Sequence, residues 1–214
     1  MHDPGFDITH ARPLPRRFYD RDPRRVAREL LGKILLRKHG RRLLAGRIVE
    51  VEAYLGVNDP AAHAAAGPTA RNLVLFGPPG FAYVYFIYGN HYCLNVSCMP
   101  EGKAGSVLFR ALEPVAGLEQ MFRSRELPLP DAAPRVTDLR LLTTGPGRLT
   151  QALGITRERD NAKDLTTFSD LTILDDGARS GRVLTTPRVG IIKAAEPKLR
   201  YLFADSSFVS GKKG

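Results

Sequence analysis

The amino-acid sequence predicts an α+β fold, in which one mixed domain is built on an antiparallel β-sheet with helices at either side. Three observations support this class. The length of 214 residues fits one domain with a sizeable core better than two domains. Strand-like segments follow one another through short turns, and strands joined in this way pair antiparallel. Helical patterns precede and follow these strands.

The chain begins with a Pro- and Arg-rich arm, residues 1–20, whose terminal position favours poor order. Residues 21–214 form the single domain. Its first element is a helix in which Asp22 is the N-cap, Pro23 takes the first helical position and Gly32 ends the pattern. Two strands joined by the turn HGRR then follow, at residues 33–38 and 43–56.

The middle of the chain predicts a hairpin, because residues 81–99 form two strand patterns about the two-residue loop Gly89-Asn90. A further strand is expected at residues 104–112. The pattern then becomes helical at residues 113–127 and 145–155, and residues 124–147 between these segments predict a loop around LPLPDAAP. The last fifty residues return to short strands.

The charge is strongly positive, with 32 Lys and Arg against 22 Asp and Glu, a formal net charge of +10. Of the cations, 24 are Arg and 8 are Lys. Arg has a planar fork that suits bidentate contacts with phosphate, so the balance favours a polyanionic partner. The alternative is a basic proteome or simple solubility, and charge alone does not name the polyanion.

The sequence lacks the features of membrane proteins, secreted proteins and zinc-binding proteins. No apolar run approaches the roughly 18 residues of a membrane span, and the N-terminus lacks the apolar centre of a signal peptide. We therefore expect no membrane partner and a protein that is not secreted, but lies in the cytoplasm, at a bacterial nucleoid, or in a eukaryotic nucleus. Cys93 and Cys98 are expected as buried thiols, since their spacing suits neither a disulfide nor a structural zinc site. The five His match no zinc motif, so no metal is expected.

Two carboxylates and a phenol share one face of the strand RIVEVEAYLG. Period-2 alternation places Ile48, Glu50, Glu52 and Tyr54 on one side, and Val49, Val51 and Ala53 on the core side. The alternative is a solvated strand face with alternating charge. The loop that follows contains His63, which by itself is weak evidence for a site.

The predicted hairpin is rich in aromatic residues. Tyr83 and Tyr85 share a face, while Tyr88 and His91 flank the Gly89-Asn90 turn and should project from the tip. A two-stranded ribbon with an aromatic tip can enter a groove of duplex nucleic acid and wedge into the base stack. The alternative is an ordinary aromatic hairpin that seals a core.

At these positions the chain resembles the alkyladenine (3-methyladenine) DNA glycosylase family, in the ordered blocks RIVEVEAYLG, AAH, FAYVYFIYGNHYCLNVS, VLFRALEP and GPGRLTQALGI. The resemblance runs from about residue 20 to the last strand FVS. It implies a curved antiparallel sheet with a protruding hairpin. It also implies a monofunctional base-excision repair enzyme that slides on duplex DNA, flips a damaged purine into a pocket, and hydrolyses its N-glycosidic bond without metal or cofactor.

The resemblance also implies roles for individual residues. Glu52, in the E-A-Y motif, would be the general base that deprotonates a water for attack at the sugar C1′. Tyr54 would stack on one face of the flipped base, with His63 and Tyr85 on the other, and the His63 main-chain amide would read the purine edge. Arg110 matches an Arg near the catalytic water, where it would favour the ionised carboxylate.

Four further positions follow from the same resemblance. Asn95 would crowd the 2-amino group of guanine, and Tyr88 would fill the gap left by the flipped nucleotide. Asn90 departs from the family, which commonly has Met there. Because Asn presses less well on the unpaired base, this change weakens the expectation for flipping but not for chemistry. Leu75 replaces a pocket-lining Met found in some relatives, which is a mild change of volume.

The leading hypothesis is therefore a DNA glycosylase that acts as a monomer on double-stranded DNA containing damaged purines such as 3-methyladenine, hypoxanthine or ethenoadenine. Two alternatives belong to other classes. A non-catalytic nucleic-acid-binding protein could use the same basic, aromatic hairpin. A sugar glycosidase could use Glu50 and Glu52 as an acid–base pair, although a basic surface suits a neutral substrate poorly, and neighbours on one strand face point in parallel.

Overall fold

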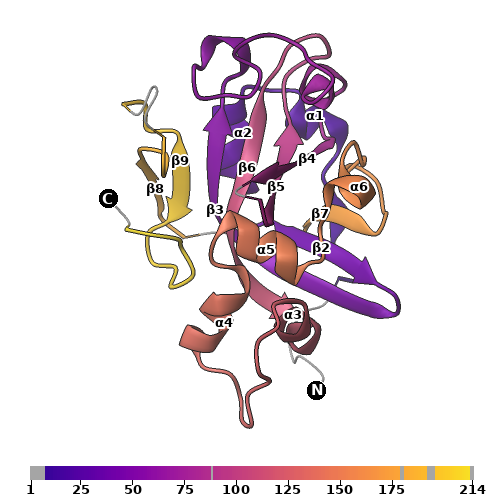
Figure 1. The fold of residues 1–214 in the computed structure, drawn as a ribbon, viewed down its shortest axis with the longest axis vertical. Helices are drawn as coiled ribbons and strands as arrows, with labels where there is room; N and C mark the ends of the chain where they lie inside the picture. The colour runs from indigo at the N-terminus through magenta and orange to yellow at the C-terminus, as the bar shows by residue number, and fades with distance from the viewer. Residues whose placement is uncertain (1–7, 88, 179–180, 192–195, 213–214) are drawn as a thin grey trace.

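The computed structural model describes residues 8–87, 89–178, 181–191 and 196–212, and it confirms the α+β class. Over these residues, nine strands form one antiparallel sheet that curls into a half-barrel, with helices packed around it (Figure 1). The chain forms a single domain, as the sequence predicts. No helix among the described residues is long and apolar enough to cross a membrane.

Seven strands follow a continuous order across the sheet. From one edge to the other they are β1 (Arg12–Pro13), β7 (Leu171–Asp175), β2 (Ile34–His39), β3 (Arg42–Tyr54), β6 (Ser106–Ala116), β5 (His91–Ser97) and β4 (Ala82–Ile87). The remaining two, β8 (Val183–Thr186) and β9 (Arg200–Phe203), pair with each other, and β9 also pairs with β3. They form the yellow ribbon at the left of Figure 1.

β3 is the centre of the sheet and bends along its length. Its first part pairs with β2, and Glu50–Glu52 pair with β9 along the same edge. Its register with β6 shifts between Ile48 and Glu50 and again between Glu50 and Val51. Such bulges bend a strand and increase its twist, so they account for part of the curl of the sheet.

The predicted alternation along β3 is confirmed from Val49 onward. Val49, Val51 and Ala53 are buried in the main hydrophobic core, while Glu50 and Glu52 lie on the other side. Ile48 was placed with the carboxylates but is fully buried in the same core as Val49. The register shift next to Ile48 interrupts the period of two, which explains the difference.

Two predicted helices are present, and α2 (Pro23–Leu30) starts as expected, because the Asp22 side chain accepts a hydrogen bond from the main-chain N–H of Arg24. The other, α5 (Pro146–Ala152), packs on β5 and β6. In Figure 1, α5 lies in front of the strands and α2 lies behind β3 and β6. Both helices contribute buried side chains to the main core.

The region from 113 to 147 differs from the prediction. β6 continues to Ala116, and α3 (Leu118–Ser124) begins only after Gly117, whose φ of 77° breaks the strand. Within the predicted loop 124–147 lies another helix, α4 (Val136–Thr143), which packs on α5 and β6. A helix of eight residues is marginal by itself, so tertiary packing stabilises it where the local pattern is weak.

The predicted hairpin is present. Ile87 of β4 pairs with His91 of β5, and the described part of the connection between them is Gly89-Asn90. Gly89 takes a φ of 75°, a left-handed conformation that suits glycine. The hairpin that the resemblance implies is therefore present at the edge of the sheet.

Part of the predicted N-terminal arm packs on the domain. β1 pairs with β7, and Tyr19 at the end of α1 (Arg16–Tyr19) is fully buried. Residues 1–7 lie outside the described residues. The remaining short elements are α6 (Arg157–Asp160) and the 3-10 helices η1 (Gly56–Asn58) and η2 (Leu73–Phe76).

Candidate active site

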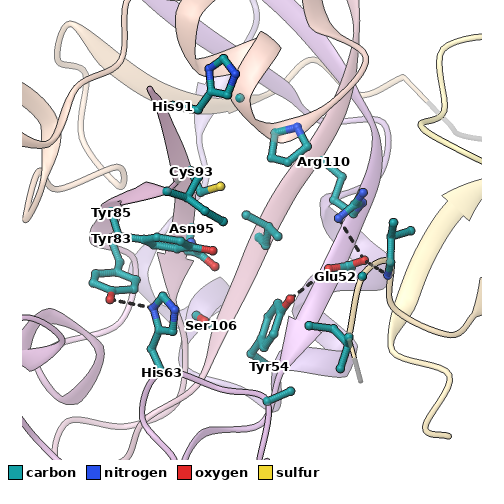
Figure 2. Close-up of a pocket in the computed structure, with 18 of the residues that line it drawn as sticks. Glu52, Tyr54, His63, Tyr83, Tyr85, His91, Cys93, Asn95, Ser106 and Arg110 are labelled. Atoms are coloured by element: carbon teal, nitrogen blue, oxygen red, sulfur yellow. Dashed lines mark hydrogen bonds and ion pairs between the residues drawn. The ribbon is translucent and has the colours of Figure 1, made fainter. Parts of the chain in front are cut away.

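A cavity of about 400 Å³ opens between the concave side of the sheet, the start of α5 and the segment after β8. It collects residues that lie far apart in the sequence (Figure 2). All seven residues predicted for catalysis or for binding the base line it: Glu52, Tyr54, His63, Leu75, Tyr85, Asn95 and Arg110. His91 lines it too, and the rest of the wall is made by Ala61, Tyr83, Ile87, Cys93, Ser106, Leu108, Pro146, Gly147, Val189, Gly190 and Ile191.

Glu52 is fully buried and yet lines this cavity. Its Oε1 accepts a hydrogen bond from the main-chain N–H of Val189 at 2.7 Å and lies 3.2 Å from Nη1 of Arg110. Its Oε2 accepts a hydrogen bond from the Tyr54 hydroxyl at 3.0 Å. A carboxylate removed from bulk solvent and held from three sides has one orientation, so its free lone pairs are directed.

Arg110 reaches both carboxylates of β3 because the strands bulge where it lies. Glu50 pairs with Ala111 and Val51 pairs with Phe109, so Arg110 is the extra residue of β6. Bulges commonly re-aim a side chain near an active site. Burial opposes the charge of Arg110, but the charges of Glu52 and Glu50 outweigh burial and raise its pKa above the ordinary value. The guanidinium therefore stays charged.

Glu50 does not line the cavity, although it shares a strand face with Glu52. It is fully buried, and its Oε1 accepts hydrogen bonds from Nε of Arg110 at 2.9 Å and from Nε of Arg200 at 2.7 Å. Ser210 binds both of its oxygens, Oε1 through the hydroxyl and Oε2 through the main-chain N–H. Every oxygen of Glu50 is thus engaged by protein groups.

Tyr54 forms one wall of the cavity and is itself supported from behind. The guanidinium of Arg188 lies 4.6 Å from the centre of its ring, and Arg188 is buried in a bidentate pair with Asp59. Burial, and then the charge of Glu52, raise the pKa of Tyr54 above its ordinary value. The hydroxyl is therefore protonated and can donate to Glu52.

The opposite wall is aromatic, as Figure 2 shows. The rings of His63 and Tyr85 lie 4.4 Å apart between centroids, and those of Tyr83 and Tyr85 lie 5.4 Å apart. Nδ1 of His63 is 2.9 Å from the Tyr83 hydroxyl. His63 is exposed at the mouth of the cavity, but burial of its ring among these walls, and then the charge of Arg71, lower its pKa. Burial raises the pKa values of Tyr83 and Tyr85, so this wall is uncharged.

Asn95 and Leu75 line the cavity, and both are buried. Among the described residues, Nδ2 of Asn95 has no hydrogen-bond partner. A buried amide donor left without a partner costs free energy, which a ligand that supplied an acceptor would recover. Cys93 also lines the cavity, and it and Cys98 are the buried free thiols that the sequence predicts.

The three residues predicted to enter DNA have different positions. Tyr88 lies outside the described residues. Asn90 is exposed at the tip of the hairpin. His91 was expected to project from the tip, but its ring packs so closely on Gly147 of α5 that a Cβ added to this glycine would lie 2.9 Å from Cγ of His91. His91 therefore joins the hairpin to the wall of the cavity.

Four residues of this centre were not found from the sequence: Arg188, Val189, Arg200 and Ser210. Arg188 and Val189 lie in TTPRVGII, Ser210 lies in FVS, and Arg200 is the first residue of β9. All four are in the last fifty residues, where the sequence indicated only short strands. The signal available was weak, because a single Arg or Ser in a strand region has no diagnostic spacing. Among the described residues, no group of His, Cys, Asp and Glu could hold a metal ion.

A cavity that combines aromatic walls with a buried, oriented carboxylate has the lining expected of an enzyme pocket. Comparison with known proteins agrees. Residues 17–207 match the family model for methylpurine-DNA glycosylase (MPG), and the chain belongs to this family. Its members are hydrolases that act on N-glycosyl bonds in DNA with damaged bases, and so the resemblance seen in the sequence is confirmed.

Similar proteins from three bacteria carry the name "Putative 3-methyladenine DNA glycosylase". The chain is 60% identical to the one from Koribacter versatilis over 211 residues, covering 98% of this chain and 99% of the relative. It is 46% identical to the one from Burkholderia lata over 199 residues, covering 92% and 91%. It is also 46% identical to one from Rhodopseudomonas palustris over 211 residues, covering 97% and 94%.

Proposed function

We propose that this chain is a monofunctional DNA glycosylase in which Glu52 activates a water to release a flipped, damaged purine. The supporting observation is that Glu52 is a fully buried carboxylate that nevertheless lines the aromatic cavity. In the proposed step the water oxygen attacks C1′ of the sugar and its proton passes to Glu52. The N-glycosidic bond breaks, and its electron pair leaves with the purine.

The extruded base is proposed to lie between Tyr54 and the wall of His63 and Tyr85. Stacking accepts any planar base, which suits an enzyme for several lesions such as 3-methyladenine, hypoxanthine and ethenoadenine. The unpaired Nδ2 of Asn95 adds selectivity, because the 2-amino group of guanine is also a donor and two donors repel. All of these residues come from one chain, which is consistent with a monomer.

The product is proposed to be an intact strand with an abasic site. A lyase needs an amine that forms a Schiff base with the sugar. No Lys is among the residues that line the described cavity. Hydrolysis by water therefore fits the composition of the site.

The two alternatives fit less well. A sugar glycosidase that used Glu50 with Glu52 would need both carboxylates at the substrate, but Glu50 is turned away to Arg200 and Ser210. A non-catalytic binder has no need of a carboxylate in the slot, since its negative charge opposes binding of DNA and its desolvation costs stability.

The test is a gel assay with four duplexes that contain 3-methyladenine, hypoxanthine, ethenoadenine or no lesion, each treated with alkali after incubation. A glycosylase gives strand cleavage only after alkali and only at the lesion. Cleavage without alkali, or an adduct trapped by borohydride, would indicate a lyase. Binding of lesion DNA with no cleavage of any lesion duplex, including one with 3-methyladenine, would favour the non-catalytic alternative.

A further inference from the structure

Behind the proposed base, Glu52, lies a second layer of buried charged and polar side chains that take no direct part in the reaction. It consists of Glu50, Arg200 and Ser210, all of them buried. Arg200 also donates from Nη1 to the main-chain oxygen of Lys212 at 2.8 Å and from Nη2 to that of Ser210. The layer therefore connects β3 and β9 to the segment that follows residue 207.

This layer makes direct contacts with Arg110. Nε of Arg110 donates to Glu50 Oε1 at 2.9 Å, and Nη2 donates to the Ser210 hydroxyl at 3.2 Å. These two contacts occupy one edge of the guanidinium plane. Nη1 is left on the side of Glu52, 3.2 Å from Oε1. The direction in which Arg110 faces the cavity thus depends on Glu50 and Ser210.

The carboxylates and guanidinium groups do not form two separate ion pairs. Glu50 accepts from two guanidinium groups at one oxygen, while Arg110 lies between two carboxylates. A buried carboxylate costs a large desolvation free energy unless it is paired and fully hydrogen-bonded. Glu50 meets that condition at a position that does not line the cavity, so any role in the reaction acts through its neighbours.

We propose that Glu50 is a positioning residue of the glycosylase. It holds the guanidinium of Arg110 in the orientation that faces Glu52, with Arg200 and Ser210 fixing Glu50 in turn. This inference rests on the proposed function of the site. It predicts that the chemical step is sensitive to a carboxylate that never meets the DNA, because displacement of a charged group by about 1 Å can change a rate about a hundredfold.

The main variant is Glu50→Gln, which preserves shape and removes the charge. The matched control is Asp160→Asn, because Asp160 is also fully buried and paired with cations but does not line the cavity. Its partners are Arg37 at 2.6 Å, Lys163 at 2.9 Å and Arg159 at 3.5 Å. Both variants should lower the unfolding midpoint. At a temperature where circular dichroism shows all proteins folded, single-turnover excision and lesion-duplex affinity are then measured.

We expect Glu50→Gln to slow excision about tenfold or more with affinity within about twofold of the original, and Asp160→Asn to leave both unchanged. In an Arg110→Gln background, Glu50→Gln should have little further effect, because residues that act through one another are not additive. Rate losses that multiply in the double variant, or full activity of Glu50→Gln, would overturn the proposal.

If Glu50→Gln does not fold, a milder variant tests the positioning role of Glu50. Ser210→Ala removes only the hydroxyl that joins Glu50 to Arg110, and it should slow excision several-fold and lose this effect in the Arg110→Gln background. An unchanged rate would contradict the proposal. Failure of the proposed base is a separate outcome: it would appear as excision retained by Glu52→Gln, whatever the coupling of Glu50 to Arg110.

Discussion

The two walls of the cavity are held by different forces. On one side, Tyr54 and Glu52 are fixed by hydrogen bonds and buried ion pairs, with Arg110 and the Asp59–Arg188 pair behind them. On the other side, His63, Tyr83 and Tyr85 meet through ring contacts and a hydrogen bond between His63 and Tyr83, and the guanidinium of Arg71 lies 5.9 Å from the centre of the Tyr85 ring. One wall presents a charged, hydrogen-bonded carboxylate, and the other is lined by uncharged aromatic rings.

This difference separates two tasks. Directed lone pairs and compensated charge suit a step in which a proton moves and a bond breaks, where small displacements cost much. Stacking faces hold a ring with little demand on its hydrogen-bond pattern, so they suit the capture of varied bases. Substitutions on the charged wall should therefore change the rate of excision, and substitutions on the aromatic wall should change the retention of the base.

The largest effect is expected for Glu52→Gln. The amide keeps the shape of the side chain but cannot accept the proton of the water, so single-turnover excision should fall by on the order of a hundredfold or more. Affinity for lesion-containing duplex should be largely kept, as measured by fluorescence anisotropy. If the variant excised the lesion at a rate comparable to that of the unaltered protein, Glu52 would not be the base. The proposal that the charged wall controls the rate and the aromatic wall controls retention of the base would then be wrong.

The next effect is expected for Tyr85→Ala, which removes a stacking face from the neutral wall. The flipped base should be held less tightly by about 1–3 kcal/mol. The loss should appear in the equilibrium population of the extruded base, followed with a fluorescent base next to the lesion. Because extrusion occurs within the enzyme–DNA complex, the excision rate at saturating enzyme should fall with this population, whereas Glu52→Gln should lower the rate with the base still extruded.

A matched pair of variants deletes one hydroxyl from each wall. Tyr54→Phe keeps the stacking ring but removes the 3.0 Å hydrogen bond to Glu52, and it should slow the chemical step about tenfold. Tyr83→Phe removes the 2.9 Å contact with His63, and its effect of about 1 kcal/mol should appear in affinity. Equal effects of the two variants on the rate at saturation would contradict the comparison.

The smallest effect concerns pH. The pKa of His63 is lowered in the folded protein by burial and then by Arg71, so the unfolded chain binds a proton there more readily. Its contribution to stability is complete above the ordinary His value of about 6.5 and is lost as the pH falls through the lower, folded value. Urea unfolding of the protein and of His63→Gln should therefore show a smaller loss of stability on acidification for the variant. Parallel losses would mean that His63 is not held neutral.

Much of this protein could be predicted from short segments. The N-cap Asp22 marked α2, and the turn residues near Gly89 marked the β4–β5 hairpin, because these signals need only neighbours in the chain. Alternation placed Glu52 and Tyr54 on one face of β3 for the same reason. The helix α4 and the end of β6 were missed, since packing rather than local pattern decides them.

The sequence by itself determined that β3 presents two carboxylates and a phenol on one face, because a strand has a period of two that no partner can change without a bulge. Only the tertiary structure decided which carboxylate faces the cavity. Glu50 and Glu52 are equivalent by periodicity. Glu50 is taken up by Arg200 and Ser210, which are 150 and 160 residues away, while Glu52 is left beside the aromatic slot. A buried carboxylate is costly unless it has charged and hydrogen-bonding partners. Those partners come from distant segments that only the fold brings together, and so the fold decides the role of each glutamate.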